Sequence, residues 1–313
     1  MREITLEELL EAGCHFGHQV TRSNPKARDF VFEARDNIQI IDLAKTKEGL
    51  EQAAAFIKEL AEKGGSLLIV GTKRQAQGIL DQEIVRAREL LKNGNPAQNG
   101  GLYYVTNRWI GGVLTNLSEV SKNFKKLNDL KEKLVSPEEK AKYTKREVGL
   151  WDKERQRLEV LYGGVSGLKE KPDAMFIIDS HLEDLAVREA RVMGVTTVAI
   201  VDTNADPSVI DYPIPANDDA VGSIQLIVTY IMDAWVEGRK EHGKRVQKEA
   251  EKTLKEQEKA KEKPESKVQN PEGKGEKPEK ESKSNTSAKP VSKTKPKNTK
   301  ADKTASKKTT KGN

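Results

Sequence analysis

Short apolar runs alternate with longer segments of helical character along most of this chain. The runs expected to form strands are residues 38–42, 66–70, 102–106, 174–179, 197–202 and 212–215. Strands that alternate with helices in this way are typical of a parallel sheet with helices packed on both faces. The sequence therefore predicts a doubly wound α/β core of three layers.

Capping residues and glycines mark the ends of the expected helices. Thr5 and Glu8 have the spacing of a capping box, which opens a short first helix. Gly64 and Gly65 end a helix expected over about residues 43–63, and Gly194 ends another before residue 197. A further helix is expected to end near Lys92. A final helix is expected over about residues 220–237.

The segment between residues 106 and 174 is too long for an ordinary crossover between strands. Its first half has apolar residues at the spacings of three and four that are typical of a coiled coil: Leu117, Val120, Phe124, Leu127, Leu130 and Leu134. Ser136, Pro137 and Glu139 then supply an N-cap, a first-turn proline and a capping-box acid, so a second helix is expected to begin there. It is expected to end at Gly163 and Gly164.

These boundaries predict an antiparallel helical hairpin over residues 116–162, inserted into a core made of residues 1–115 and 163–240. Such an arm suits a protein that contacts several partners. The side chains expected to form its partner-protein surface are Leu117, Val120, Phe124, Leu127, Tyr143 and Trp151.

Charge is unevenly distributed along the chain. From Glu241 onward there are 22 Lys plus Arg against 12 Asp plus Glu, a net charge of +10, whereas residues 1–240 carry 33 against 37, a net charge of −4. Residues 241–313 are expected to form a helical extension and then a Lys-rich, low-complexity tail that is disordered when free. Two interpretations of the tail stay open, an arm that binds RNA phosphates and a solubilising segment.

Composition excludes several classes of protein. The single cysteine, Cys14, rules out an intramolecular disulfide and fits a reducing compartment. No apolar run approaches the roughly 20 residues that span a bilayer, and residues 1–8 lack the pattern of a signal peptide. A cytoplasmic protein without a membrane partner is expected.

The stretch from Tyr104 to Asn116 sets cationic, aromatic and glycine residues together directly after an apolar strand. Arg108 can meet a phosphate or a base edge, Trp109 offers a face for base stacking, and Gly111 with Gly112 allows close approach of the backbone. A Trp beside two glycines is also typical of a core residue at a strand-to-helix turn. Both interpretations stay open.

Three other clusters suggest binding chemistry. Cys14, His15 and His18 have zinc-ligand types, but a fourth ligand is hard to name, so packed histidines or RNA phosphate contacts are favoured and no metal is expected. Lys73 and Arg74 follow a buried strand, where phosphate contact and ordinary solvation are both reasonable. A basic loop is formed by Arg22, Asn24, Lys26 and Arg28.

An enzyme on the same fold is the rival interpretation. Ligands of open α/β sheets bind at the carboxyl ends of strands, where this chain has Lys73, Asp179 and Asp202. However, the chain has no phosphate loop after residue 70, no Gly-x-Gly-x-x-Gly after the first strand and no Gly-x-Ser-x-Gly. Asp179 and Asp202 are more simply caps of the segments that follow. No catalytic residue, cofactor or small-molecule substrate is therefore expected.

Several short motifs occur in one order along the chain: Cys14–His18, Asn24–Lys26, Ile40–Thr46, Gly71–Gln75, Tyr104–Asn116, and Val201–Asn204 followed by Tyr212–Pro215 and Asn217–Asp219. In this order they resemble the second protein of the small ribosomal subunit, in its bacterial form. The resemblance covers about residues 3–237.

The resemblance implies a flavodoxin-like or Rossmann-like fold and a structural, non-catalytic role in the small ribosomal subunit. The implied partners are small-subunit ribosomal RNA and neighbouring ribosomal proteins, with the large RNA-binding protein S1 as one candidate. A free-standing RNA-binding scaffold and a sugar-phosphate or nucleotide enzyme remain the alternatives. The candidate RNA-binding residues are His15, His18, Arg22, Asn24, Lys26, Arg28, Lys73, Arg74, Asn107, Arg108, Trp109, Gly111, Gly112 and Asn116.

Overall fold

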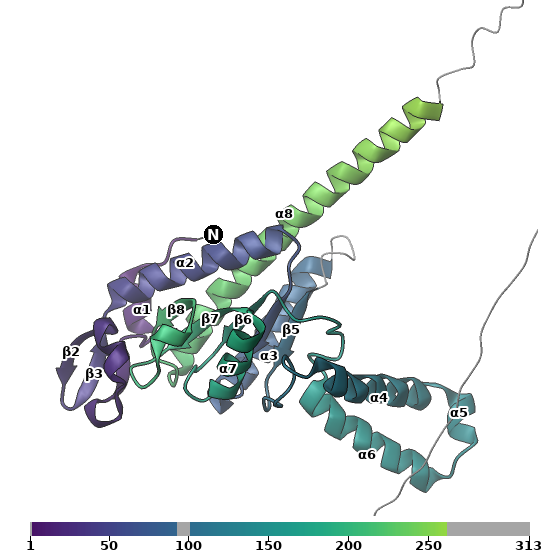
Figure 1. Ribbon diagram of the computed structural model, residues 1–313, viewed down its shortest axis with the longest axis horizontal. Helices are drawn as coiled ribbons and strands as arrows, with labels where there is room; N and C mark the ends of the chain where they lie inside the picture. Colours follow the sequence, from purple (N-terminus) through teal and green to yellow (C-terminus); the bar gives the residue numbers. More distant parts are fainter. Residues whose placement is uncertain (1, 93–100, 262–313) are drawn as a thin grey trace, which may run out of the picture. The chain divides into compact units, whose positions relative to one another are not determined.

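A five-stranded parallel sheet forms the centre of the protein, and its strands are those expected from the apolar runs (Figure 1). The computed structural model describes residues 2–92 and 101–261, so the Lys-rich end of the tail lies outside the described residues. The strands are β4 (Leu67–Val70), β5 (Leu102–Val105), β6 (Ala174–Ile177), β7 (Thr196–Val201) and β8 (Tyr212–Pro215). Their order across the sheet is β5-β4-β6-β7-β8. Numbered along the chain from β4, this is the 2-1-3-4-5 order of flavodoxin-like sheets.

Helices cover both faces of this sheet, which confirms the predicted three-layer α/β/α core. One face carries α1 (Leu6–Glu11), α2 (Leu43–Glu62), α3 (Arg74–Lys92) and α8 (Val221–Lys261). The other face packs against α7 (Asp184–Met193) and against parts of α4 (Leu117–Val135) and α6 (Lys145–Tyr162). Successive residues of β4 point to opposite faces, so Leu67 and Ile69 join the first cluster while Leu68 and Val70 join the second.

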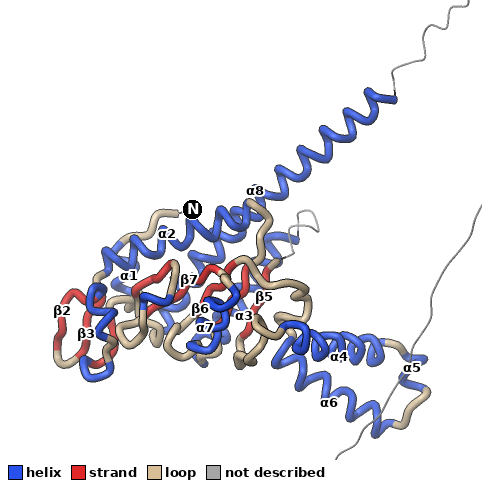
Figure 2. Tube along the Cα trace, in the orientation of Figure 1, coloured by secondary structure: helices blue, strands red, loops and turns tan. Residues whose placement is uncertain are grey.

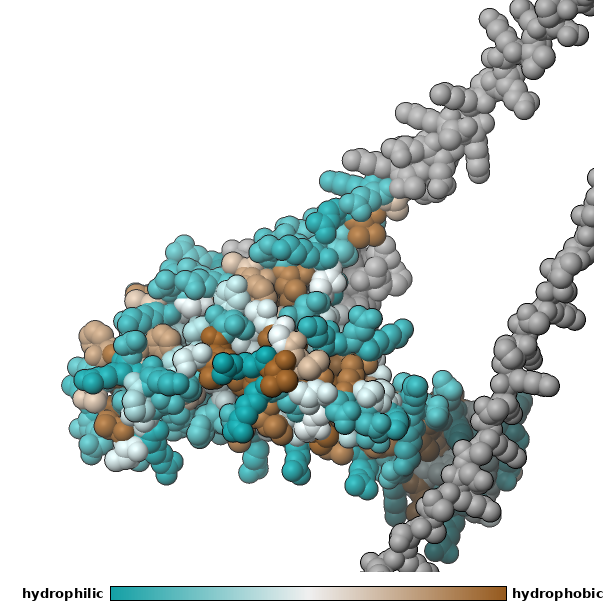
Figure 3. Space-filling model, viewed as in Figure 1, coloured by the Kyte–Doolittle hydropathy of each residue, from teal (hydrophilic) through white to brown (hydrophobic). Residues whose placement is uncertain are grey.

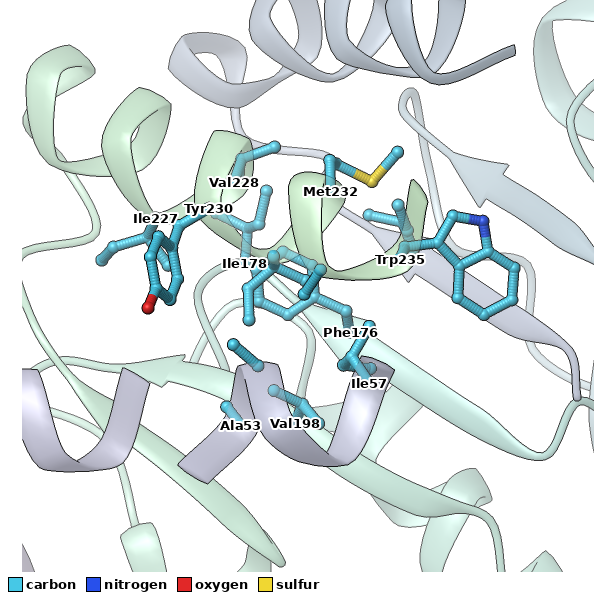
Figure 4. Close-up of a cluster of buried hydrophobic side chains, with 14 of the residues drawn as sticks. Ala53, Ile57, Phe176, Ile178, Val198, Ile227, Val228, Tyr230, Met232 and Trp235 are labelled. Atoms are coloured by element: carbon cyan, nitrogen blue, oxygen red, sulfur yellow. The ribbon is translucent and has the colours of Figure 1, made fainter. Parts of the chain in front are cut away.

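The larger of the two cores lies under α8 (Figure 4). Trp235 and Met232 of this helix are fully buried, and Figure 4 shows them above Phe176 of the sheet, with Ile57 of α2 nearby. Full burial of a side chain of this size stabilises the fold by about 1.5–3 kcal/mol. These buried side chains hold the helix expected over residues 220–237 against the sheet. The helix continues unbroken to Lys261.

Helices α2 and α8 approach closely at Gly238. A Cβ atom built there would overlap the carbonyl oxygen of Lys58 and would lie 2.7 Å from the Cβ of Ala61. Glycine is therefore required by the approach of the two backbones, although it is a poor helix former.

Gly238→Ala is expected to destabilise the fold by about 1–3 kcal/mol, since the overlap outweighs the gain of up to about 1 kcal/mol in helix propensity. Gly149→Ala in α6 is the matched control, because nothing lies within 4 Å of its added Cβ, and it should be neutral or stabilising. Urea unfolding of both variants measures the difference. Equal stabilities would show that the helices do not need the glycine.

The strand expected at residues 38–42 was wrongly assigned to the parallel sheet. It is β3 (Ile38–Ile41), the middle strand of a separate antiparallel sheet with β1 (Phe16–Gln19) and β2 (Val31–Arg35). Asp36 and Asn37 both have positive φ, the conformation of a two-residue hairpin turn. Such a turn reverses the chain directly, so β2 and β3 pair antiparallel.

Helices α4 and α6 pack against each other, joined by the short α5 (Pro137–Ala141) (Figure 2). The predicted start at Ser136 is confirmed, since its side chain accepts a hydrogen bond from the backbone N–H of Glu139. The prediction of one continuous second helix is wrong, because Thr144 and Glu147 form a new capping box that starts α6. A capping side chain offers the backbone an alternative to continuing the previous helix.

The partner-protein surface predicted for the hairpin needs correction. Val120, Phe124 and Leu127 are buried, and Phe124 packs edge-on against Tyr162 of α6, with ring centroids 5.6 Å apart. Leu117 is half-buried against the same cluster. The coiled-coil spacing therefore describes the seam between the two helices. Of the six predicted residues, only Tyr143 is exposed, and its ring packs on the half-buried Trp151, with centroids 4.5 Å apart.

Within the described residues, no helix is both long enough and apolar enough to cross a membrane.

Candidate functional site

A buried cluster of charged side chains lies at the carboxyl edge of the parallel sheet. Lys73 follows β4, Asp179 follows β6, Asp202 follows β7, and Asp218 follows β8. The β4–β6 pair is the point where the strand order reverses, which is where ligands bind in sheets of this kind. In this protein the groups at that edge are bonded mainly to one another.

Lys73 is the cation at the centre of this cluster. Its Nζ lies 3.0 Å from Asp179 Oδ2, 2.7 Å from Asp218 Oδ1 and 2.7 Å from Asp219 Oδ1, and its side chain is only 14% exposed. Burial lowers the pKa of Lys73, but the carboxylates, Asp218 first among them, outweigh burial and raise it above its ordinary value. The ammonium thus has three internal acceptors. Lys73 therefore serves as a counter-ion within this cluster, and its phosphate contact stays a prediction.

Asp218 is fully buried, and its Oδ2 atom has no hydrogen-bond partner among the described residues. Burial, followed by the negative charges of Asp179 and Asp202, raises the pKa of Asp218 to about 7, although Lys73 opposes the shift. Near neutral pH this carboxyl group therefore exchanges a proton.

His18 joins the same cluster from β1. Its Nδ1 lies 3.1 Å from Asp202 Oδ1, and its Nε2 lies 3.4 Å from Asp219 Oδ2. The hydrogen bond to Asp202 is the main cause that raises the pKa of His18. The alternative of a packed, internally bonded histidine is therefore supported, and the expected RNA contact of His18 is not.

The stability of the protein should fall as pH rises from about 5 to about 8. Asp218 and His18 both have pKa values raised by folding, so the folded state binds more protons than the unfolded state in this range. Each proton held only by the folded state costs about 1.4 kcal/mol of stability per pH unit as pH rises. Urea unfolding across this range measures the slope, and Asp218→Asn should reduce it. An unchanged slope in that variant would contradict the assignment to Asp218.

Cys14 and His15 do not join the cluster. Cys14 is fully buried, and burial raises its thiol pKa. The half-buried His15 ring lies 3.9 Å from that of Phe16, and burial lowers the pKa of His15. Among the described residues, the group that could hold a metal ion is instead His18 with Asp218 and Asp219, whose ligand atoms all lie within 4.8 Å of one another. Lys73 already provides positive charge for both of these aspartates.

The predicted cap at Asp179 is confirmed. Asp179 has a φ of 68°, an uncommon value for a residue other than glycine. Its Oδ1 accepts hydrogen bonds from the backbone N–H groups of His181, at 3.1 Å, and Leu182, at 2.8 Å. Asp202 Oδ1 accepts from the backbone N–H of Thr203. Asp179 thus fixes a turn, and both aspartates take part in the central cluster.

The loop after β5 is organised by Glu189, a residue of α7 that is only 6% exposed. One carboxylate oxygen accepts from Trp109 Nε1 at 3.2 Å and from the Gly112 N–H at 2.8 Å. The other accepts from the N–H groups of Leu114 and Thr115 and from the Thr115 hydroxyl, each at 3.1 Å. Burial raises the pKa of Glu189, but these donors, Gly112 first, outweigh it and lower the pKa.

This contact corrects two predicted roles in the loop. Trp109 is 7% exposed and belongs to the core, so its face is closed to base stacking and the alternative interpretation is supported. The N–H of Gly112, where φ is 94°, is used by Glu189. The loop therefore exposes Asn107, Arg108 and Gly111 instead.

All four of the predicted arginines are accessible. Arg22, Arg28, Arg74 and Arg108 are exposed and have no ion pair or hydrogen bond through their side chains within the described residues. Lys26 is exposed but paired, with its Nζ 2.6 Å from Asp206 Oδ2. Asn24 is the N-cap of the 3-10 helix Pro25–Phe30. Asn116 is exposed at the start of α4.

Glu189 and Asp218 were not among the predicted site residues. Glu189 had a usable signal, because it falls on the side of α7 that carries the buried Ala186 and Ala190. An acid on the apolar side of a helix needs a buried partner. Asp218 had no comparable signal, since its partners come from distant parts of the sequence.

Comparison with known proteins identifies the family of this chain. Residues 9–238 match the Ribosomal protein S2 family. A protein of Geotalea uraniireducens (strain Rf4), named "Small ribosomal subunit protein uS2", is 42% identical over 251 residues, which cover 80% of this chain and 93% of that protein. A protein of the same name from Sorangium cellulosum (strain So ce56) is 44% identical over 250 residues, covering 79% of this chain and 85% of that protein. The chain therefore belongs to the ribosomal protein S2 family.

Proposed function

We propose that this protein is a non-catalytic structural component of the small ribosomal subunit and acts in translation. The observation that carries the proposal is the match to proteins named "Small ribosomal subunit protein uS2", which extends over nearly the whole length of one relative. Its partners would be small-subunit ribosomal RNA and neighbouring ribosomal proteins, with S1 as one candidate. Its location would be the cytoplasmic ribosome.

The RNA contact is proposed to lie on the exposed arginines. Arg22 and Arg28 flank the turn at Asn24, Arg74 opens α3, and Arg108 follows β5. Guanidinium groups without internal partners are free to bind phosphates and base edges. Glu189 would hold the Arg108 loop in one conformation, so the loop would not have to order itself on binding.

We propose that the arm contacts neighbouring proteins and that the tail contributes electrostatic attraction to RNA. Residues 1–115 and 163–240 would form the core, and residues 116–162 an antiparallel coiled-coil arm directed at proteins. The arm has exposed apolar side chains of its own, among them Tyr143 and Leu150, which could contact a protein partner. Residues 241–313 would add an electrostatic anchor, because they hold the excess positive charge.

The enzyme alternative is less well supported by the site. Lys73 and the aspartates at the carboxyl edge neutralise one another, so the charges expected to bind a sugar phosphate are already used. A free-standing scaffold protein would share the exposed arginines. It differs in where the protein accumulates, which sedimentation with ribosomal subunits measures.

Arg108→Ala is expected to weaken binding of the full chain to small-subunit ribosomal RNA by about 3–10-fold and to reduce the salt dependence of binding by about one phosphate contact. Lys63→Ala is the control, because Lys63 is exposed but engaged with Glu59 on α2. Filter binding over a range of salt concentrations measures both quantities. If the two variants behaved alike, the loop would not contact RNA.

A further inference from the structure

Helix α7 exposes apolar side chains on its outer face while its inner face is buried in the core. Val192 is 76% exposed and Leu185 is 51% exposed, and Leu182, just before the helix, is 55% exposed. Leu185 and Val192 are seven residues apart, so they lie on one side of the helix two turns from each other. Ala186, Val187 and Ala190 fill the opposite side and are buried. We call the exposed set Leu182, Leu185 and Val192 the outer stripe.

The outer side of α7 carries these apolar side chains together with the exposed charged residues Asp184, Arg188 and Arg191. In Figure 3, which has the view of Figure 1, brown side chains stand at the surface among teal ones in the region of α7. Isolated exposed apolar residues need no explanation, but a contiguous patch with a polar rim is typical of a protein–protein contact.

The rim of the outer stripe is mainly cationic. Arg188 lies between Leu185 and Val192 along the helix and is bonded to Asp184. Arg191 is exposed and has no side-chain partner in the described part of the chain. The stripe also continues onto the loop after β5, because a Cβ at Gly111 would lie 3.4 Å from Leu185 Cδ2. That loop adds Arg108, which is exposed and unpaired.

Leucine and valine methyl groups suit an apolar side chain better than a nucleotide, which is recognised through stacking on aromatic or guanidinium planes and through polar contacts. Cations at the rim select acids on the partner. We propose that the outer stripe of α7 docks an acidic, amphipathic segment of a neighbouring protein in the same ribosomal particle. This inference rests on the proposed function, since it takes the particle as the place where the partner is met.

The docking surface and the proposed RNA contact at Arg108 lie next to each other, because α7 contacts the loop that carries Arg108. Glu189 lies one turn after Leu185 on α7 and holds the loop that carries Arg108, while Leu185 contacts the same loop at Gly111. The protein partner and the RNA would therefore meet at one border of the molecule.

Val192→Glu tests the surface with little risk to folding, because the side chain is mostly solvent-exposed. Its binding to small subunits that lack this protein should weaken by about tenfold, while its binding to naked small-subunit ribosomal RNA should change by less than about twofold. Val85→Glu on α3 is the matched control, since Val85 is 54% exposed on another helix, and it should change neither. Arg191→Glu should weaken binding to the particle in the same way as Val192→Glu.

A photo-crosslinking residue at position 192, in otherwise complete small subunits, identifies the occupant. A crosslink to an acidic, amphipathic segment of a ribosomal protein is the expected result. A crosslink to RNA, a crosslink to a basic segment, no crosslink, or equal behaviour of Val192→Glu and Val85→Glu would overturn the proposal. Failure of the unmodified protein to sediment with small subunits would instead overturn the proposed function, so the two failures are distinguishable.

Discussion

Glu189→Ala should destabilise the folded protein by about 3–5 kcal/mol, because it removes a buried acceptor and leaves several buried donors without a partner. The donors are the indole of Trp109 and the groups of Gly112, Leu114 and Thr115. Glu189→Gln should lose less than the alanine variant. The glutamine side chain keeps one acceptor oxygen, but its amide N–H₂ group would face the N–H and O–H donors that the second carboxylate oxygen now accepts from. Urea unfolding gives the free energy of unfolding of each variant.

The control for this prediction lies on the same helix. Asp184→Ala removes an exposed carboxylate paired with Arg188, a type of contact worth less than about 1 kcal/mol. The pH dependence supplies a second check. The pKa of Glu189 is lowered by folding, so its contribution is present at neutral pH and should be lost as pH falls through its folded pKa. A Glu189→Ala loss no larger than that of Asp184→Ala would contradict the role given to this carboxylate.

Lys73→Met should cost about 3–5 kcal/mol, because it leaves the carboxylates of Asp179 and Asp218 buried without their counter-ion. The loss should be smaller at about pH 5.5 than at about pH 8, since Asp218, with its pKa raised to about 7, is mostly protonated at the lower pH. Thermal or urea unfolding at the two values measures the difference.

The double variant Lys73→Met/Asp218→Asn measures the interaction energy between these two side chains. If the ammonium and the carboxylate stabilise each other, the double variant should be more stable than the sum of the two single losses predicts. Additive losses would show that Lys73 does not stabilise the fold through its pairing with Asp218.

The fold was predictable from sequence because local patterns determine its elements. The runs at residues 66–70 and 174–177 are buried on both faces, and such strands appear in a sequence as continuous apolar segments. The caps at Thr5, Ser136 and Gly194 are likewise local, and the structure has all three. The assignment of β3 failed because its length and composition suit either sheet. Only the turn at Asp36 and Asn37 distinguishes them.

The candidate site was less predictable because its contacts join distant parts of the chain. Lys73 meets Asp179 across 106 residues and Asp218 across 145, and Trp109 meets Glu189 across 80. Residue type alone could not show whether Lys73 and Trp109 face RNA or the core. The exposure of Arg22, Arg28, Arg74 and Arg108 was easier to predict, because arginine is rarely buried unless it is paired.

Sedimentation with ribosomal subunits tests the central claim most directly. Lysate is fractionated on sucrose gradients at moderate and at high salt, and the full chain is followed beside a version truncated after Lys261, where the described part of α8 ends. The account predicts that the full chain sediments with small subunits in one-to-one ratio at moderate salt. It also predicts that the truncated form is released at lower salt than the full chain. If most of the full-length protein stayed at the top of the gradient at moderate salt, this protein would not be a structural component of the small subunit.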